Sequence, residues 1–116
     1  VFTNQNSHKI NVSTYGPLVE NHNIFPEKVN FEVATIESRD YIEVGVWERG
    51  SGITLACGTG ACAVTAIGIR QKLLDTQVTV RLPGGELKVS WTGRGEDEMI
   101  LEGPVETICT GTYNFG

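Results

Sequence analysis

The sequence predicts an α+β domain in which a mostly antiparallel β-sheet curls around one buried central helix. Three observations lead to this fold class. Residues 29–35 and 41–47 alternate apolar and polar residues, as half-buried strands do. Residues 58 to about 74 form an almost unbroken apolar run that is typical of a buried helix. Residues 77–91 have the pattern of a hairpin, so a sheet and a helix must share one core.

The first quarter of the chain predicts one strand and one helix. A short strand is expected at residues 9–12. A helix is expected to open at Pro17, because proline is tolerated in a first turn, and to end at Phe25 and Pro26. His22 falls near the end of this helix and is expected to be exposed, with no chemical role.

The middle of the chain predicts two strands and the central helix. Residues 37–40 form a polar turn between the strands at 29–35 and 41–47. The helix that begins at residue 58 has almost no polar face before Arg70, so we expect protein to surround it.

The last third predicts a hairpin and one more strand. The hairpin pairs residues 77–82 with residues 86–91 across a turn at 83–85. A polar loop then leads to a short strand at residues 98–101. Neither a long linker nor an internal repeat divides the sequence, so residues 1–116 are expected to form a single unit.

The composition bounds the partners of this unit. The 116 residues are 40% apolar, which suits a modest core, and no stretch approaches the roughly 20 apolar residues that a membrane span needs. The chain has 9 Lys and Arg against 14 Asp and Glu, which gives a net charge of −5. This charge and a pI near 4.9 disfavour a nucleic-acid partner, whose phosphates attract a basic surface.

The three cysteines, Cys57, Cys62 and Cys109, indicate a reducing compartment. Their number is odd, they lack a Cys-x-x-Cys spacing, and the sequence shows no secretory leader. We therefore expect a cytoplasmic protein. No metal site is expected, because only His8 and His22 are available to join the cysteines and no zinc-like spacing is present.

The most informative residue is Cys57, which precedes two glycines and the apolar helix. The free amides of a helix start and the helix dipole favour an ionised thiol there and can also bind a carboxylate. One turn of chain could thus hold an amino acid by its carboxylate and place a sulfur beside its alpha carbon. The alternative is that Cys57 is a small core residue at a glycine-rich turn.

Three further features are weak when taken alone. His8 can be an ordinary turn histidine, and Asn30 can be a strand residue with its amide satisfied by a neighbour. Glu48 and Arg49 can form a surface salt bridge at a strand end, which is the usual fate of such charges.

Longer motifs connect these features. The sequence WERGSG at residues 47–52 is followed by ACGTGA at 56–61, and GPLVENH at 16–22 leads through Phe25 and Pro26 to Asn30. With these motifs the chain resembles the C-terminal half of diaminopimelate epimerase, from about residue 6 to the end.

The resemblance implies an enzyme that uses no cofactor and inverts the alpha carbon of LL-2,6-diaminopimelate to the meso form. In that family one cysteine thiolate removes the alpha proton while a second cysteine returns a proton from the opposite face. Cys57 matches one of the two, and the other belongs to an N-terminal half that this chain lacks. Neither Cys62 nor Cys109 lies in a matching context, so we expect Cys62 to be a core residue of the helix and Cys109 to be structural. The residues matched to substrate contacts are Asn6, Asn30, Glu48, Arg49, Gly58 and Thr59. His8 and Glu48 are matched to catalytic groups that tune the pKa of the thiols.

Two departures from the family pattern affect the prediction. Residues 5–8 read Gln-Asn-Ser-His where the family usually has Gly-Asn-Pro-His. Residues 1–116 match only the C-terminal domain of a two-domain enzyme, so we expect this chain alone to be inactive. Its last strand, around residues 105–115, would then be an exposed edge that is prone to pair with a second copy as a homodimer.

Other functions remain open at this point. Proline racemase-like enzymes share the fold and a Cys-Gly-Thr-Gly run, although WERG fits them less well. The phenazine-biosynthesis relatives generally lack the cysteine. A non-catalytic carboxylate-binding module that kept the fold is an alternative of a different class. Pyridoxal phosphate is not indicated, because no lysine lies in a Schiff-base context. The family resemblance also implies a role in lysine and peptidoglycan-precursor biosynthesis.

Overall fold

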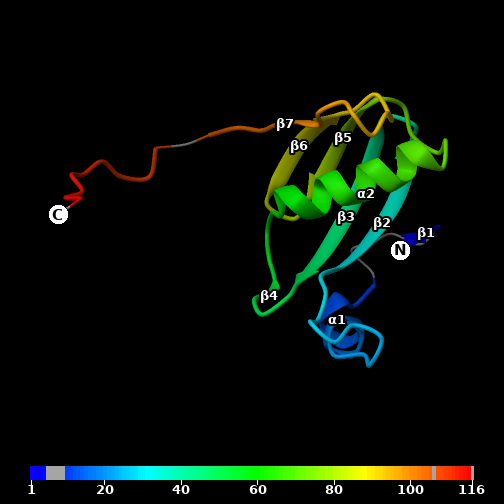
Figure 1. The fold of residues 1–116 in the computed structure, drawn as a ribbon, viewed down its shortest axis with the longest axis horizontal. Coiled ribbons are helices and arrows are strands. Elements are labelled where there is room, and N and C mark those ends of the chain that lie inside the picture. The colour runs from blue at the N-terminus through cyan, green and yellow to red at the C-terminus, as the bar shows by residue number, and fades with distance from the viewer. Residues whose placement is uncertain (5–9, 106, 116) are drawn as a thin grey trace.

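A computed structural model describes residues 1–4, 10–105 and 107–115 of the chain. The described residues form two helices and a seven-stranded sheet (Figure 1). Helix α1 is Val12–Glu20 and helix α2 is Gly58–Arg70. The strands are β1 (Phe2–Thr3), β2 (Phe31–Ser38), β3 (Tyr41–Glu48), β4 (Gly52–Ile53), β5 (Gln77–Leu82), β6 (Gly85–Ser90) and β7 (Ile100–Glu102). The α+β class is therefore confirmed.

The sheet is mixed, because two of the six strand pairs in the described residues are parallel; the other four are antiparallel as expected, and the expected curling around one helix is not confirmed. Its order is β1-β2-β3-β5-β6-β7, and β4 pairs with β3 beside this path. Strand β1 runs parallel to β2, and β3 runs parallel to β5, whereas the other pairs are antiparallel. The physical reason is the connection between β3 and β5. It passes through α2, and a helical crossover returns the chain in the same direction.

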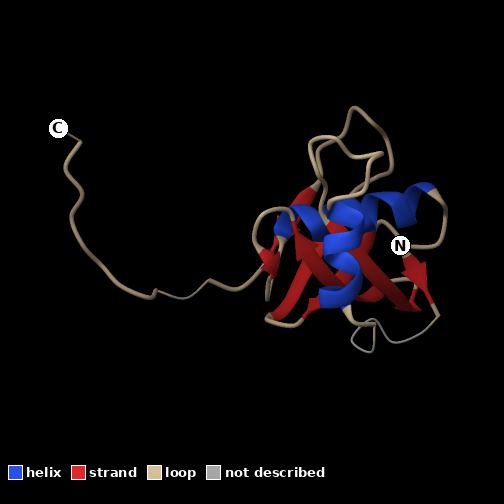
Figure 2. Cartoon of the chain, turned by 90° about the horizontal axis from the view of Figure 1, so that it is seen from below, coloured by secondary structure: helices blue, strands red, loops and turns tan. Residues whose placement is uncertain are grey.

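Helix α2 lies across one face of the sheet (Figures 1 and 2). Alternation directs Ile42, Val44 and Val46 of β3 toward this helix, and all three are buried in the core with Ala61 and Val64. The opposite face of α2 is not covered, since Ile67 is 51% exposed. The expectation that protein surrounds the helix is thus wrong for this chain, because its sheet contacts only one side of α2. The helix also ends at Arg70 rather than near residue 74.

Helix α1 lies at the end of the sheet where β3 meets β4 (Figure 1). It begins at Val12, so residues 10–12 are not the expected strand and the helix does not open at Pro17. Asn11 explains the earlier start, because its side chain accepts a hydrogen bond from the Thr14 amide at 3.3 Å and caps the helix. Pro17 lies inside the helix, where its missing N–H removes one internal hydrogen bond.

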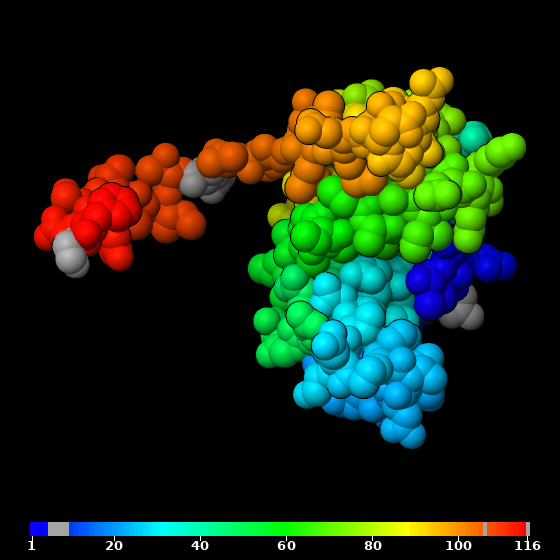
Figure 3. All heavy atoms as spheres, viewed as in Figure 1, coloured from blue at the N-terminus to red at the C-terminus, as the bar shows by residue number. Residues whose placement is uncertain are grey.

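The remaining strands follow the sequence pattern closely. The strands expected at 29–35 and 41–47 are β2 and β3, and the hairpin is β5 with β6. Strand β7 lies one to two residues later than expected, at Ile100–Glu102. The described residues beyond Glu102 form no strand and extend away from the body as an exposed tail (Figure 3). Of the helices in the described ranges, neither has the length and apolar character to cross a membrane.

Candidate functional site at the start of helix α2

Cys57 is the N-cap residue of α2. Its backbone is extended, with φ of −145° and ψ of 103°, and its carbonyl accepts the first helical hydrogen bond from the Ala61 amide at 3.0 Å. The sulfur takes the part of a capping side chain, because the Gly60 amide donates to Cys57 Sγ at 3.3 Å. The Thr59 hydroxyl lies 3.5 Å from the same sulfur and shares a hydrogen bond with it. The sulfur is therefore surrounded by groups that can stabilise negative charge.

Cys57 is also a core residue, with 4% of its surface exposed. It belongs to the cluster that includes Val46 and Ala61. The two interpretations of this residue are thus compatible: its backbone and Cβ pack in the core, while the sulfur contacts the first turn of α2.

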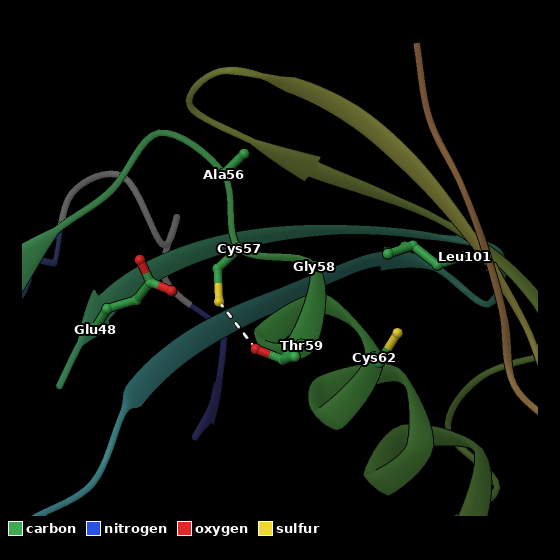
Figure 4. A pocket seen from close by; sticks show the side chains of 7 residues that line it. All are labelled: Glu48, Ala56, Cys57, Gly58, Thr59, Cys62 and Leu101. Atoms are coloured by element: carbon green, nitrogen blue, oxygen red, sulfur yellow. Dashed lines mark hydrogen bonds between the residues drawn. The ribbon is translucent and has the colours of Figure 1, made fainter. Parts of the chain in front are cut away.

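A cleft of about 550 Å³ opens beside this turn (Figure 4). We call it the Cys57 cleft. Figure 4 shows that the Glu48 side chain ends on one side of Cys57, whereas Cys62 and Leu101 lie on the other. The cleft thus combines an apolar wall with a sulfur, a hydroxyl and a carboxylate. Its lining residues are Glu48, Ala56, Cys57, Gly58, Thr59, Cys62 and Leu101.

Glu48 reaches the cleft from a tight hairpin between β3 and β4. Trp47 pairs with Ile53 and Glu48 with Gly52, so the chain reverses over residues 49–51. Gly50 and Gly52 have φ of 78° and 79°, the left-handed region that side chains with a Cβ rarely occupy. The glycines of the WERGSG motif are explained by this reversal, which directs the chain toward Cys57.

Asn30 and Arg49 lie together, although neither lines the Cys57 cleft. The Arg49 amide donates to Asn30 Oδ1 at 2.7 Å, and the Arg49 guanidinium donates from Nη1 to the Glu27 carbonyl at 3.2 Å. In this structure Asn30 holds the backbone of the turn. The sequence also suggested a surface salt bridge between Glu48 and Arg49. The ion pairs of the described residues do not include it.

Glu32 is a carboxylate near Cys57 that the sequence analysis missed, although it does not line the Cys57 cleft. Its Oε1 lies 3.1 Å, and Cys57 Sγ 3.2 Å, from the point that a Cβ on Gly60 would occupy. Burial raises the pKa of the Glu32 carboxyl; the charged amino group of Val1 opposes the rise and the nearby Glu48 carboxylate adds to it. A signal was available, because alternation puts Glu32 on the same face of β2 as the apolar Ala34 and Ile36.

The other two cysteines differ from Cys57. Cys62 was expected in the core, and it is partly buried against the core while also lining the cleft. Burial, followed by the proximity of Cys57, raises the pKa of the Cys62 thiol. Cys109 is exposed in the tail, which does not fit the structural role expected for it.

The remaining predicted residues, Asn6 and His8, lie outside the described residues. Of the predicted site, the structure therefore brings together Glu48, Cys57, Gly58 and Thr59 around the cleft, and it joins Asn30 to Arg49 outside the cleft. Within the described ranges, no group of three or more His, Cys, Asp or Glu side chains could hold a metal ion.

The fold and the site together define an α+β protein with a cysteine-capped helix beside a carboxylate. The chain resembles a solved phenazine biosynthesis protein of the PhzF family from Bacillus anthracis, with a TM-score of 0.58 over 86% of this chain and 32% of that one. The identity is 12%, so this likeness concerns the fold alone.

The sequence comparisons are more specific. The family model described as diaminopimelate epimerase matches residues 1–108. The diaminopimelate epimerase of Halothermothrix orenii is 50% identical over 103 residues, which are 89% of this chain. That of Acaryochloris marina is 44% identical over 107 residues, which are 92% of this chain. The chain belongs to the diaminopimelate epimerase family, and it spans 35% and 38% of the length of these two curated relatives.

Proposed function

We propose that this chain supplies the C-terminal domain of a diaminopimelate epimerase. In this proposal Cys57 is one of two cysteines that invert the alpha carbon of LL-2,6-diaminopimelate to the meso form, without a cofactor. A second domain supplies the other cysteine. The observation that carries the proposal is the position of Cys57 Sγ, which accepts the Gly60 amide at 3.3 Å and lines a cleft with Glu48.

The chemical step requires a strong electrostatic contribution from the site. An amino acid alpha proton is very weakly acidic, so a thiolate can remove it only where the developing negative charge is stabilised. The proton moves from the alpha carbon to one sulfur, the electron pair stays on the substrate, and the second thiol returns a proton to the opposite face. The amides of Gly58 and Thr59 belong to the first turn of α2, and in this proposal they stabilise charge that spreads onto the substrate carboxylate.

The other predicted residues complete the proposed site. Glu48 lines the cleft, where it tunes the Cys57 thiol and contacts the substrate in this proposal. Arg49 carries a guanidinium fork that suits a bidentate grip on the distal carboxylate. Asn30 supports Arg49 through the backbone amide. We keep Asn6 as a substrate contact and His8 as a group that tunes a thiol, on the family resemblance alone.

Exposed apolar surfaces support the need for a second domain. The uncovered face of α2 exposes Ile67, and the tail exposes Val105, Ile108 and Phe115 by 93%, 96% and 96%. Apolar surface of this extent is typical of an interaction site. We therefore propose that the 116-residue chain alone is inactive. We also propose that, in the absence of a second domain, its exposed apolar surface pairs with a second copy of the chain as a homodimer.

The test compares the chain with the two-domain protein in which an N-terminal domain precedes it. Conversion of LL-diaminopimelate to the meso form is expected only in the two-domain protein. Cys57→Ser should lower kcat by about 10²–10⁴-fold, the usual contribution of a general acid or base. Cys109→Ser is the matched control, because this cysteine is exposed in the tail and should change kcat less than twofold or so.

Alkylation of the cysteines with iodoacetamide gives a second readout. Diaminopimelate should protect Cys57 in the two-domain protein and leave Cys109 reactive. Turnover by the isolated chain would refute its inactivity. Retained turnover in Cys57→Ser would refute the role of the sulfur, and binding of diaminopimelate without turnover would favour a carboxylate-binding module.

A further inference from the structure

Glu20 is a buried carboxylate that contacts a turn far away in sequence. The last residue of α1, it is 7% exposed. Its Oε2 accepts a hydrogen bond from Trp47 Nε1 at 2.7 Å, and its Oε1 accepts one from the Gly50 amide at 3.0 Å. Both carboxylate oxygens are therefore used to hold residues that lie 27 and 30 positions further along the chain.

The position of this carboxylate is unfavourable without those partners. The carboxyl end of a helix carries partial negative charge, and α1 has no basic residue in its last turn. Burial adds a desolvation cost for the charged group. Hydrogen bonds from a donor to a carboxylate are among the stronger ones in proteins, and two of them offset these costs.

The charge state of Glu20 agrees with this geometry. The hydrogen bond from the Trp47 side chain, followed by that from the Gly50 amide, lowers the pKa of Glu20. Lys28 and Arg49 act in the same direction, whereas burial opposes them. The carboxylate therefore stays ionised and able to accept both hydrogen bonds at neutral pH.

The two donors flank the residues that the site presents. Trp47 precedes Glu48, and Gly50 follows Arg49. From the strand side, Asn30 Oδ1 accepts the Arg49 amide at 2.7 Å. The turn is thus anchored at Trp47, Arg49 and Gly50, and Glu48 lines the Cys57 cleft. Glu20 itself is not among the residues that line this cleft.

We propose that Glu20 is a positioning residue that fixes the turn carrying Glu48 and Arg49 beside Cys57. It acts through the Trp47 indole and the Gly50 amide and does not touch the substrate. The claim that the turn presents Glu48 and Arg49 to diaminopimelate rests on the proposed function. The claim that Glu20 holds the turn in place does not depend on it.

The test is Glu20→Gln, which keeps the shape of the side chain. In either orientation of the neutral amide the Gly50 N–H loses its charged acceptor, because it meets either the NH₂ group or a neutral carbonyl oxygen, and one of the two hydrogen bonds that hold the turn is lost. Glu27→Gln is the matched control. Glu27 is exposed, and its contact with Arg49 uses the backbone carbonyl, which the substitution keeps.

Two readouts separate the positioning of the turn from the function. In the 116-residue chain, hydrogen exchange of the Gly50 amide should be about tenfold faster in Glu20→Gln, as expected for the loss of a hydrogen bond to a charged group. In the two-domain protein, KM for diaminopimelate should rise by about tenfold because Arg49 is displaced, and kcat should fall as well because Glu48 moves with the same turn. A defect limited to folding would lower the active fraction, and therefore kcat, and would leave KM unchanged.

The outcomes are distinguishable. The inference would be overturned if the Gly50 amide exchanged at the same rate in Glu20→Gln as in Glu27→Gln. It would also be overturned if Glu20→Gln left KM for diaminopimelate unchanged in the two-domain protein. If the unmodified two-domain protein has no turnover, the proposed function fails, and the Gly50 exchange alone then decides whether Glu20 holds the turn. Should Glu20→Gln fail to fold, Trp47→Phe removes one donor and keeps the aromatic ring. It should still speed exchange at Gly50, and no change there would overturn the inference.

Discussion

The two turns that form the Cys57 cleft are held in place by different means. The Cys57–Gly60 turn is stabilised locally, since the sulfur accepts a hydrogen bond from the Gly60 amide three residues later and shares one with the Thr59 hydroxyl two residues later. The turn from Trp47 to Gly50 depends on side chains that are 19 to 30 residues away in sequence, Asn30 and Glu20. A locally held turn keeps its geometry as long as its helix forms. A turn held at long range depends on the packing of α1 against β3, so it is the part of the site that distant changes can displace.

The largest effect should come from disturbing that long-range packing. A Cβ on Gly16 would overlap the Trp47 ring, so Gly16→Ala should force Trp47 away from α1. Alanine favours a helix over glycine, but overpacking a close contact usually costs more. We expect the free energy of unfolding to fall by about 1–3 kcal/mol. Urea unfolding of the 116-residue chain measures this.

The control for Gly16→Ala is Gly95→Ala. A Cβ on Gly95 meets nothing within 4 Å, so the same substitution there should change the free energy of unfolding by less than about 0.5 kcal/mol. A Gly16→Ala chain as stable as Gly95→Ala would show that α1 can shift freely on the sheet. The contrast between the two turns would then be lost.

The difference between the turns also explains what the sequence could predict. The strands β2, β3, β5 and β6 follow from alternation, and the start of α2 follows from the ACGTGA motif, because these signals are local. The parallel pairing of β3 with β5 is not a local property. It depends on how α2 crosses the sheet, which no periodicity reveals.

The same reasoning applies to individual residues. Asn11 outweighs Pro17 in setting the start of α1, since a cap supplies a hydrogen bond and proline only lacks one. The uncovered face of α2 could not be foreseen from its apolar composition. Composition shows that a helix is suited to burial, and the elements that bury it lie elsewhere in the chain or outside it. Glu20 gave no signal at all, because its partners are 27 and 30 residues away.

A smaller effect is expected from the local turn. Cys57→Ala removes the acceptor for the Gly60 amide, so the free energy of unfolding should fall by about 0.5–1 kcal/mol. Cys57→Ser keeps an acceptor that is favoured at this position, and its stability should stay within about 0.5 kcal/mol of the unchanged chain.

Hydrogen exchange identifies where the Cys57→Ala effect acts. Faster exchange should be confined to the first turn of α2, with Gly50 unaffected, because the two turns do not share their supporting hydrogen bonds. Equal stability of the serine and alanine variants would mean that the sulfur does not act as a cap. A change at Gly50 would mean that the two turns are coupled.

The smallest effect concerns Glu32, whose carboxylate lies near Gly60 at the start of α2. Burial raises the pKa of Glu32 above its value in the unfolded chain, and the Glu48 carboxylate adds to this rise. The Val1 amino group acts in the opposite direction. The folded chain therefore binds this proton more tightly than the unfolded chain does, so the ionised carboxylate opposes folding at neutral pH. The penalty is lost as pH falls through the raised pKa and below the unfolded value of 4.5.

The Glu32→Gln chain should accordingly be more stable than the original chain at pH 7. The gain should be at most about 0.5 kcal/mol, because the side chain stays half exposed, and it should vanish below about pH 4. Glu37→Gln, an exposed carboxylate on the same strand, should show no such gain. Urea unfolding at several pH values measures this difference in stability. If the Glu32→Gln chain is less stable than the original at pH 7, the carboxylate makes a favourable contact with α2 that outweighs its desolvation cost.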